Sequence, residues 1–163
     1  MGVALQRVTA DMSNSFEDFN TNLIKDMRAN RGKPTSGPFK GRDVLILITK
    51  GAKSGETREN PLVYTRDRGR AHAGSTVKEN LVIVASKGGS PTHPSWYHNL
   101  VTHPEVTVEA DGEKFNARAH VPQGDEYERL YTQHADINPT FYDYRKKTSR
   151  QIPVIVLERI NSK

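Results

Sequence analysis

The sequence Val44-Leu45-Ile46-Leu47-Ile48 leads into Gly51-Ala52-Lys53-Ser54-Gly55-Glu56-Thr57-Arg58, and this junction sets the expected architecture. The apolar run is far shorter than the roughly 20 residues that cross a bilayer, and its β-branched content predicts a buried strand. The glycines after it let the backbone approach a ligand, while Lys53, Ser54 and Arg58 offer a cation, a hydroxyl and a planar fork for phosphate or carboxylate. The junction therefore predicts an anion site at a strand end; a glycine-bearing hairpin with solvated charges is the alternative.

Short strands and a few helices follow this junction along the chain. Segments of β-branched or alternating character, separated by Gly, Pro or Asp turns, predict strands at Val44 to Thr49, Leu62 to Arg66, Leu81 to Ala85, Val106 to Ala110, Phe115 to His120 and Ile152 to Leu157. Helices are expected over residues 13–30, 94–100, 124–134 and 139–147. Ala110-Asp111-Gly112-Glu113 is typical of a hairpin turn. The pattern predicts an α+β barrel of about six strands with flanking helices, not alternating βαβ units.

The chain length of 163 residues supports one hydrophobic core and therefore a single domain. Residues 1–39 are expected to form an N-terminal amphipathic helix and loop, and residues 40–163 the barrel. The helix carries Phe16, Phe19, Leu23 and Met27 at helical spacing, which favours packing on its own domain, with contact to a membrane surface as the alternative. The polar segment Asp67 to Asn80 exceeds a tight hairpin and is expected to be a surface insertion or a lid.

A second glycine-rich stretch, Ala85-Ser86-Lys87-Gly88-Gly89, follows another apolar strand. Paired glycines allow main-chain amides to come close to a ligand, and Lys87 adds positive charge. Pro94 then suits the first turn of a helix, whose N-terminus favours anions. Trp96 and Tyr97 add planar surface that faces either a cofactor or the core. Two cationic glycine loops at strand ends strengthen the case for an anion site.

Several function classes lack their residues in this sequence. The chain has no cysteine, which excludes disulfides, thiolate zinc sites and a cysteine nucleophile. Ala52 and Leu47 stand where a P-loop needs glycine, and no Gly-x-Ser-x-Gly elbow occurs. His93, His98 and His103 recur every fifth residue, which rotates them by about 140° on a helix, so no metal site is expected. The net charge of +5 comes without a nucleic-acid motif, and no secretory leader is recognisable, so a cytoplasmic protein is expected.

The motifs, taken together, identify a family. The order Gly51-x-Lys53-Ser54-Gly55-x-x-Arg58-x-x-Pro61-Leu62, then Ala85-Ser86-Lys87-Gly88-Gly89 with His93-Pro94-x-Trp96-Tyr97-x-Asn99-Leu100, resembles the deazaflavin (coenzyme F420)-dependent nitroreductase family. The resemblance covers roughly residues 40 to 158. It implies a split β-barrel like that of FMN-binding proteins, and an oxidoreductase that passes hydride from reduced coenzyme F420 to a quinone, enone or nitroaromatic.

The same resemblance implies roles for individual residues. Lys53, Arg58 and Lys87 would hold the anionic phosphate and oligoglutamate portion of the coenzyme. The wider cofactor-binding set would add Ser54, Asn60, Pro61, Leu62, Ala85, Ser86, Gly88, Gly89, Trp96, Tyr97, Asn99 and Tyr144. The substrate would lie beside Phe141 and Tyr144, with Ser86 or Tyr144 as proton donor.

Two departures and two alternatives accompany this prediction. Asn138 and Phe141 stand where the best-known nitroreductase has tyrosines, so a substrate preference different from nitro-prodrug activation is expected. The second departure is the segment Asp67 to Asn80, which is longer than the usual hairpin of the family. The alternatives are an FMN-dependent reductase on the same fold and a carrier that binds deazaflavin, heme or lipid without turnover. The oligomeric state stays open.

Overall fold

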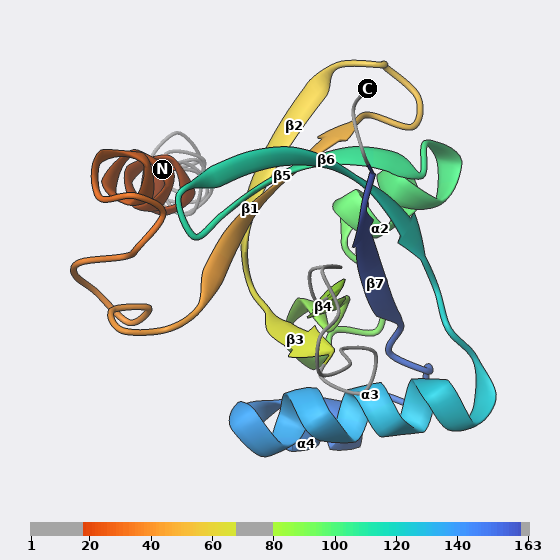
Figure 1. Ribbon diagram of the computed structural model, residues 1–163. Coiled ribbons are helices and arrows are strands. Elements are labelled where there is room, and N and C mark those ends of the chain that lie inside the picture. The colour runs from red at the N-terminus through yellow and green to blue at the C-terminus, as the bar shows by residue number, and fades with distance from the viewer. Residues whose placement is uncertain (1–17, 68–79, 161–163) are drawn as a thin grey trace, which may run out of the picture.

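The computed structural model describes residues 18–67 and 80–160, and its strands form one curled antiparallel sheet (Figure 1). The strands are β1 Val44–Lys50, β2 Thr57–Val63, β3 Thr65–Asp67, β4 Asn80–Val84, β5 Glu105–Ala110, β6 Glu113–His120 and β7 Val154–Arg159. The helices are residues 18–29, the short 3-10 turn η1 Lys87–Gly89, α2 Ser95–Thr102, α3 Gly124–Ile137 and α4 Thr140–Lys147. The predicted α+β class is confirmed.

The sheet has seven strands in the order β2-β1-β5-β6-β7-β4-β3, so the predicted number of about six is wrong. The expected strand Leu62 to Arg66 divides at Tyr64: the part before it pairs with β1, and the part after it pairs with β4. Only Tyr64 separates the two edge strands, and its N–H donates to the Asp43 carbonyl at 3.1 Å. The edges of the sheet are therefore consecutive in the chain, and the sheet curls into a half-barrel.

Strand β1 is buried on both faces, which explains its unbroken apolar sequence. Leu45 and Leu47 face the interior of the half-barrel, whereas Val44 and Ile46 pack outward against the helix of residues 18–29. That helix contributes Leu23, Ile24 and Met27, and the side chain of Met27 is fully buried. Burial of such a side chain stabilises the fold by about 1.5–3 kcal/mol. The outer face of β1 thus fixes the N-terminal helix on the sheet.

The N-terminal helix was predicted over residues 13–30, of which 13–17 lie outside the described residues. Its apolar face is occupied by β1, in agreement with packing on its own domain, and nothing in the described residues supports the alternative of membrane contact. Within residues 18–67 and 80–160, no helix combines the length and apolarity needed to cross a bilayer. The insertion expected at Asp67 to Asn80 lies outside the described residues except for its ends in β3 and β4.

Helices α3 and α4 cover the outer face of β4 and β7, while α2 closes one end of the half-barrel (Figure 1). Leu130 and Tyr131 of α3 pack on Val82 and Val156. Trp96 and Leu100 of α2 enter the interior cluster instead. The predicted hairpin between β5 and β6 is confirmed, with positive φ at both Asp111 and Gly112 as a type I′ turn needs.

Candidate functional site

An open groove of about 1320 Å³ follows the edge strand β2. The N-terminal helix, the turn between β1 and β2, and α2 form its walls. Six residues of the predicted cofactor set line it, namely Lys53, Ser54, Arg58, Asn60, Trp96 and Asn99. The first cationic motif and part of the second, more than thirty residues apart in sequence, therefore share one surface.

The position of β2 explains why its polar residues reach the groove. Arg58 and Asn60 are two residues apart and share one face of the strand, while Thr57 and Glu59 on its other face also line the groove. Within the part of the chain that the structure describes, β2 pairs with β1 alone. Pro61, which lacks an N–H, is tolerated because β2 is an edge strand. The motif that follows β1 is thus a hairpin whose second strand borders the groove.

The turn at residues 51–56 is closed by its own hydrogen bonds. The Gly51 N–H donates to the Glu56 carbonyl at 2.7 Å, and the Gly55 N–H donates to the Gly51 carbonyl at 2.9 Å. A Cβ on Gly51 would lie 2.6 Å from the Ser54 Oγ, and Gly55 has φ +74°. The turn itself therefore favours glycine at Gly55 through its positive φ, and a side chain at Gly51 would displace the Ser54 hydroxyl, independently of any ligand.

Asn99 fastens this turn to α2. Its Oδ1 accepts a hydrogen bond from the Ala52 N–H at 2.9 Å, and its Nδ2 donates to Thr49 Oγ1 at 3.2 Å. The side chain is buried, so both bonds are shielded from water. The predicted cofactor residue Asn99 thus also holds the two walls of the groove together.

The charged residues that line the groove give it a net positive charge, since Lys25, Arg28, Lys53 and Arg58 outnumber Asp18 and Glu59. Within residues 18–67 and 80–160, Lys53 and Lys25 have no ion pair, and Arg58 has only an exposed pair with Glu56 at 3.4 Å. Arg28 is different, since its guanidinium lies 2.8 Å from both Glu59 and Glu109 and lowers the pKa of Glu109. The remaining cations give the groove the donor set of an anion site.

The second glycine motif lies against α4 instead of lining this groove. A Cβ on Gly89 would lie 2.9 Å from the Lys147 Cβ and 3.1 Å from the Tyr144 carbonyl, so close packing requires glycine there. Lys87 is exposed, and its Nζ donates to Thr92 Oγ1 at 3.3 Å. Ser86, Lys87, Gly88, Gly89 and Tyr144 therefore form a second cluster, which we call the α4 cluster.

Histidines at the start of α2 join the groove to the α4 cluster. His98 lines the groove, and its ring centroid lies 5.7 Å from those of both His93 and Tyr97. His93 in turn contacts Arg150, which binds the carbonyl of Ser86. Sequence reasoning missed Arg150, because an isolated arginine between α4 and β7 matches no motif.

Phe141 contacts Tyr144 and connects it to a buried histidine. The ring centroids of Phe141 and Tyr144 are 5.2 Å apart, and those of Phe141 and His134 are 4.5 Å apart. The Nδ1 of His134 lies 3.0 Å from Thr65 Oγ1, and burial lowers the pKa of His134 to about 4. A neutral His134 therefore supports the aromatic wall that was predicted for substrate.

Four predicted residues lie elsewhere. Leu62, Ala85 and Tyr97 pack with the interior core, and Pro61 does not line the groove. Asn138 is buried, and its Nδ2 donates to the His134 carbonyl at the end of α3. Asn138, which replaces a tyrosine of the best-known nitroreductase, thus stabilises the junction between α3 and α4.

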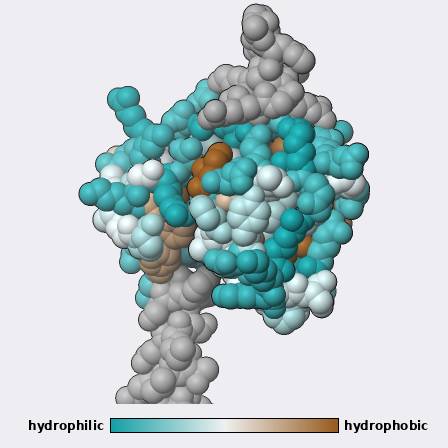
Figure 2. Space-filling model, turned by 90° about the horizontal axis from the view of Figure 1, so that it is seen from below, coloured by the Kyte–Doolittle hydropathy of each residue, from teal (hydrophilic) through white to brown (hydrophobic). Residues whose placement is uncertain are grey.

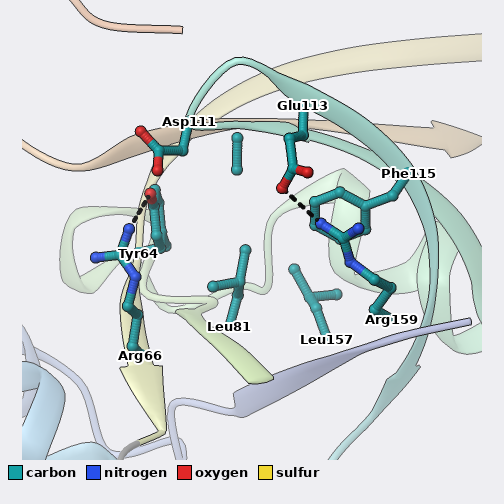
Figure 3. Close-up of a pocket in the computed structure, with 9 residues that line it drawn as sticks. Tyr64, Arg66, Leu81, Asp111, Glu113, Phe115, Leu157 and Arg159 are labelled. Atoms are coloured by element: carbon teal, nitrogen blue, oxygen red, sulfur yellow. Dashed lines mark hydrogen bonds and ion pairs between the residues drawn. The ribbon is translucent and has the colours of Figure 1, made fainter. Parts of the chain in front are cut away.

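A smaller hollow of about 310 Å³ opens at the other end of the half-barrel (Figure 3). Its charged groups are largely satisfied: Arg159 pairs with Glu113 at 2.8 Å, and Arg66 donates to the Tyr64 hydroxyl at 3.2 Å. None of the predicted site residues lines it. On the face below α3 and α4, hydrophobic colour is confined to small separate patches (Figure 2). The groove along β2 is therefore the better candidate site.

The fold and the groove define a half-barrel protein with a candidate anion site along one sheet edge. The chain belongs to the F420H(2)-dependent quinone reductase family, whose model matches residues 21–159. This confirms the predicted family and the class, an oxidoreductase that uses coenzyme F420.

Relatives and solved structures agree with this assignment. The F420H(2)-dependent quinone reductase Rv1261c of Mycobacterium tuberculosis (strain H37Rv) is 40% identical over 118 residues, which are 71% of this chain and 72% of that protein. The structure of an F420-H2 dependent reductase, FDR-A, is 34% identical with a TM-score of 0.61, covering 72% of this chain and 95% of that one. A second structure, described as a domain-swapped dimer, is 28% identical with a TM-score of 0.62 and covers 90% of this chain and 98% of that one.

Proposed function

We propose that this protein reduces a quinone with hydride from reduced coenzyme F420. The observation that carries the proposal is the groove along β2, where Lys53 and Arg58 stand without a buried counter-charge. A ligand with a phosphate and an oligoglutamate tail would be held there by several cations at once. Family membership and the quinone reductase names of the relatives support the same reaction.

The cofactor would be held from both motifs. Lys53, Ser54 and Arg58 would bind its anionic portion in the groove, and Lys87 would add charge from the α4 cluster. When bound, the deazaflavin supplies two electrons as hydride from a carbon atom. The family's split-barrel arrangement fits the seven-stranded half-barrel and its neighbours among F420-dependent reductases.

The chain itself would orient the acceptor and handle the proton. Phe141 and Tyr144 present two rings at 5.2 Å, against which a planar quinone would rest. A reduced quinone must gain a proton, and the hydroxyls of Tyr144 and Ser86 in the α4 cluster are the donors we assign. Nitroaromatics would be weaker acceptors, since Phe141 lacks the hydroxyl of the tyrosine that stands there in the best-known nitroreductase.

A fluorescence titration with coenzyme F420, run beside FMN, tests the cofactor. Menadione is then added to the reduced complex, and reoxidation is compared with a protein-free control. Selective binding of F420 and faster reoxidation support the proposal. Preference for FMN would replace it with a flavin reductase, and F420 binding without reoxidation would make the protein a carrier.

A further inference from the structure

Arg150 lies between α4 and β7, and among the described residues its guanidinium donates only to main-chain carbonyls and a histidine. Its Nε donates to the Ser90 carbonyl at 2.9 Å, and its Nη2 donates to the carbonyls of Ser86 at 2.9 Å and Ala85 at 3.3 Å. Its Nη1 lies 2.9 Å from the Nδ1 of His93. Within residues 18–67 and 80–160, no carboxylate pairs with it. The hydrogen bonds of the guanidinium therefore go to the backbone of residues 85–90 and to His93.

That loop has a backbone that needs external support. Lys87, Gly88 and Gly89 have φ values of +48°, +65° and +83°, and the left-handed region is unfavourable for the non-glycine residue Lys87. Arg150 binds the carbonyls of Ser86 and Ser90 on either side of these residues. Such strain persists only where surrounding contacts over-determine it, and Arg150 supplies contacts at both ends.

The same guanidinium fixes the chemical form of His93. Arginine has five N–H donors and no acceptor, so the Nδ1 of His93 must accept the hydrogen bond. The neutral ring then carries its proton on Nε2. His93 also packs on Tyr97 of α2, with ring centroids 4.7 Å apart, so its ring is held by Arg150 through Nδ1 and by Tyr97 through ring packing.

We propose that Arg150 is a positioning residue for coenzyme binding: it holds the Lys87 loop in its left-handed backbone conformation and His93 in the Nε2-protonated form. The proposal rests on the proposed function only in naming the ligand, since the loop shape and the tautomer are properties of the free protein. No other described residue bonds to both ends of the loop and to His93.

Two variants and a control test this role in the full chain. R150Q removes the charge and most of the donors, and R150K keeps the charge without the planar fork. R118Q is the matched control, because Arg118 forms an exposed pair with Glu105 on another part of the sheet. We measure the Kd for coenzyme F420, the KM for F420H2 against kcat, and the His93 tautomer by long-range ¹H–¹⁵N NMR, with peaks assigned by H93Q.

R150Q is expected to raise the Kd and the KM roughly ten- to hundred-fold, with a smaller change in kcat, and to lose the single Nε2-protonated pattern of His93. R150K is expected to remain weakened, and R118Q to match wild type. Wild-type affinity in R150Q, full rescue by R150K, or an Nδ1-protonated His93 in wild type would each overturn the proposal. If R150Q does not fold, R150K and the wild-type spectrum still decide it. Failure of wild type to bind F420 would refute the proposed cofactor, whereas the NMR result would stand separately.

Discussion

The Asn99 side-chain oxygen accepts a hydrogen bond from the Ala52 N–H at 2.9 Å, and this bond ties the helix α2 to the cationic turn. Loss of the bond leaves a half-buried N–H without a partner, which destabilises a fold by about 1–3 kcal/mol.

Asn99→Ala is therefore expected to lower the free energy of unfolding by roughly 1–3 kcal/mol and to weaken F420 binding. Urea denaturation and fluorescence titration measure the two effects. Asn116→Ala is the control, because the side chain of this exposed asparagine bonds, among the described residues, only to Thr107 Oγ1 on the neighbouring strand. Equal losses in both variants would refute a special role for the Asn99 bond.

Removal of Lys53 and Lys87 together is expected to raise the Kd for F420 and to flatten its dependence on salt, because fewer cations face the anionic tail. Titrations at several salt concentrations measure both. A double change of Lys40 and Lys114 to Ala removes the same charge at other exposed positions. Unchanged affinity and salt slope in the first variant would eliminate the proposed tail site.

His134 is expected to make stability pH-dependent. Burial lowers its pKa from 6.5 to about 4 in the folded state. The contribution of neutral His134 to the free energy of unfolding is therefore fully present above pH 6.5 and is lost as the pH falls through about 4. The total loss is up to roughly 3 kcal/mol. His134→Gln does not titrate, so the difference between the two unfolding profiles isolates this residue. Parallel profiles between pH 7 and 4 would contradict the assignment.

Gly88 and Gly89 form a matched pair on the loop of the α4 cluster. Both have positive φ, but a Cβ on Gly88 meets open space, whereas one on Gly89 lies 2.9 Å from the Lys147 Cβ. Gly88→Ala is expected to destabilise by about 1–2 kcal/mol, and Gly89→Ala by a further 1–3 kcal/mol or so. Urea denaturation of both variants, fitted with a common m-value, gives the two midpoints to be compared. The opposite order would mean that the loop does not pack on α4 as described.

Much of the fold followed from local sequence. Three elements could be predicted because their signals lie within their own residues. They are β1, from its unbroken apolar residues, the turn at Asp111-Gly112, and α3, from its apolar spacing. The break at Tyr64 had no such signal, since no glycine or proline marks it. Its cause is pairing with two different partners, β1 before the break and β4 after it.

The candidate site could be predicted only in part, because some of its contacts also join residues that are far apart in the sequence. Lys53, Arg58 and Lys87 stand beside glycines at strand ends, a pattern that sequence shows directly. The partners of Arg150 lie 57 to 65 residues away, and the contact of Gly89 with Lys147 depends on where α4 docks. Such long-range contacts leave no trace in residue spacing.

The edge position of β2 has a consequence for solubility. An edge strand presents unpaired main-chain groups that another chain can extend into a larger sheet. Arg58 and Glu59 place charge on this edge, and Pro61 removes one donor. The edge residues that border the groove would thus also discourage aggregation, and replacing them with β-branched residues would favour it.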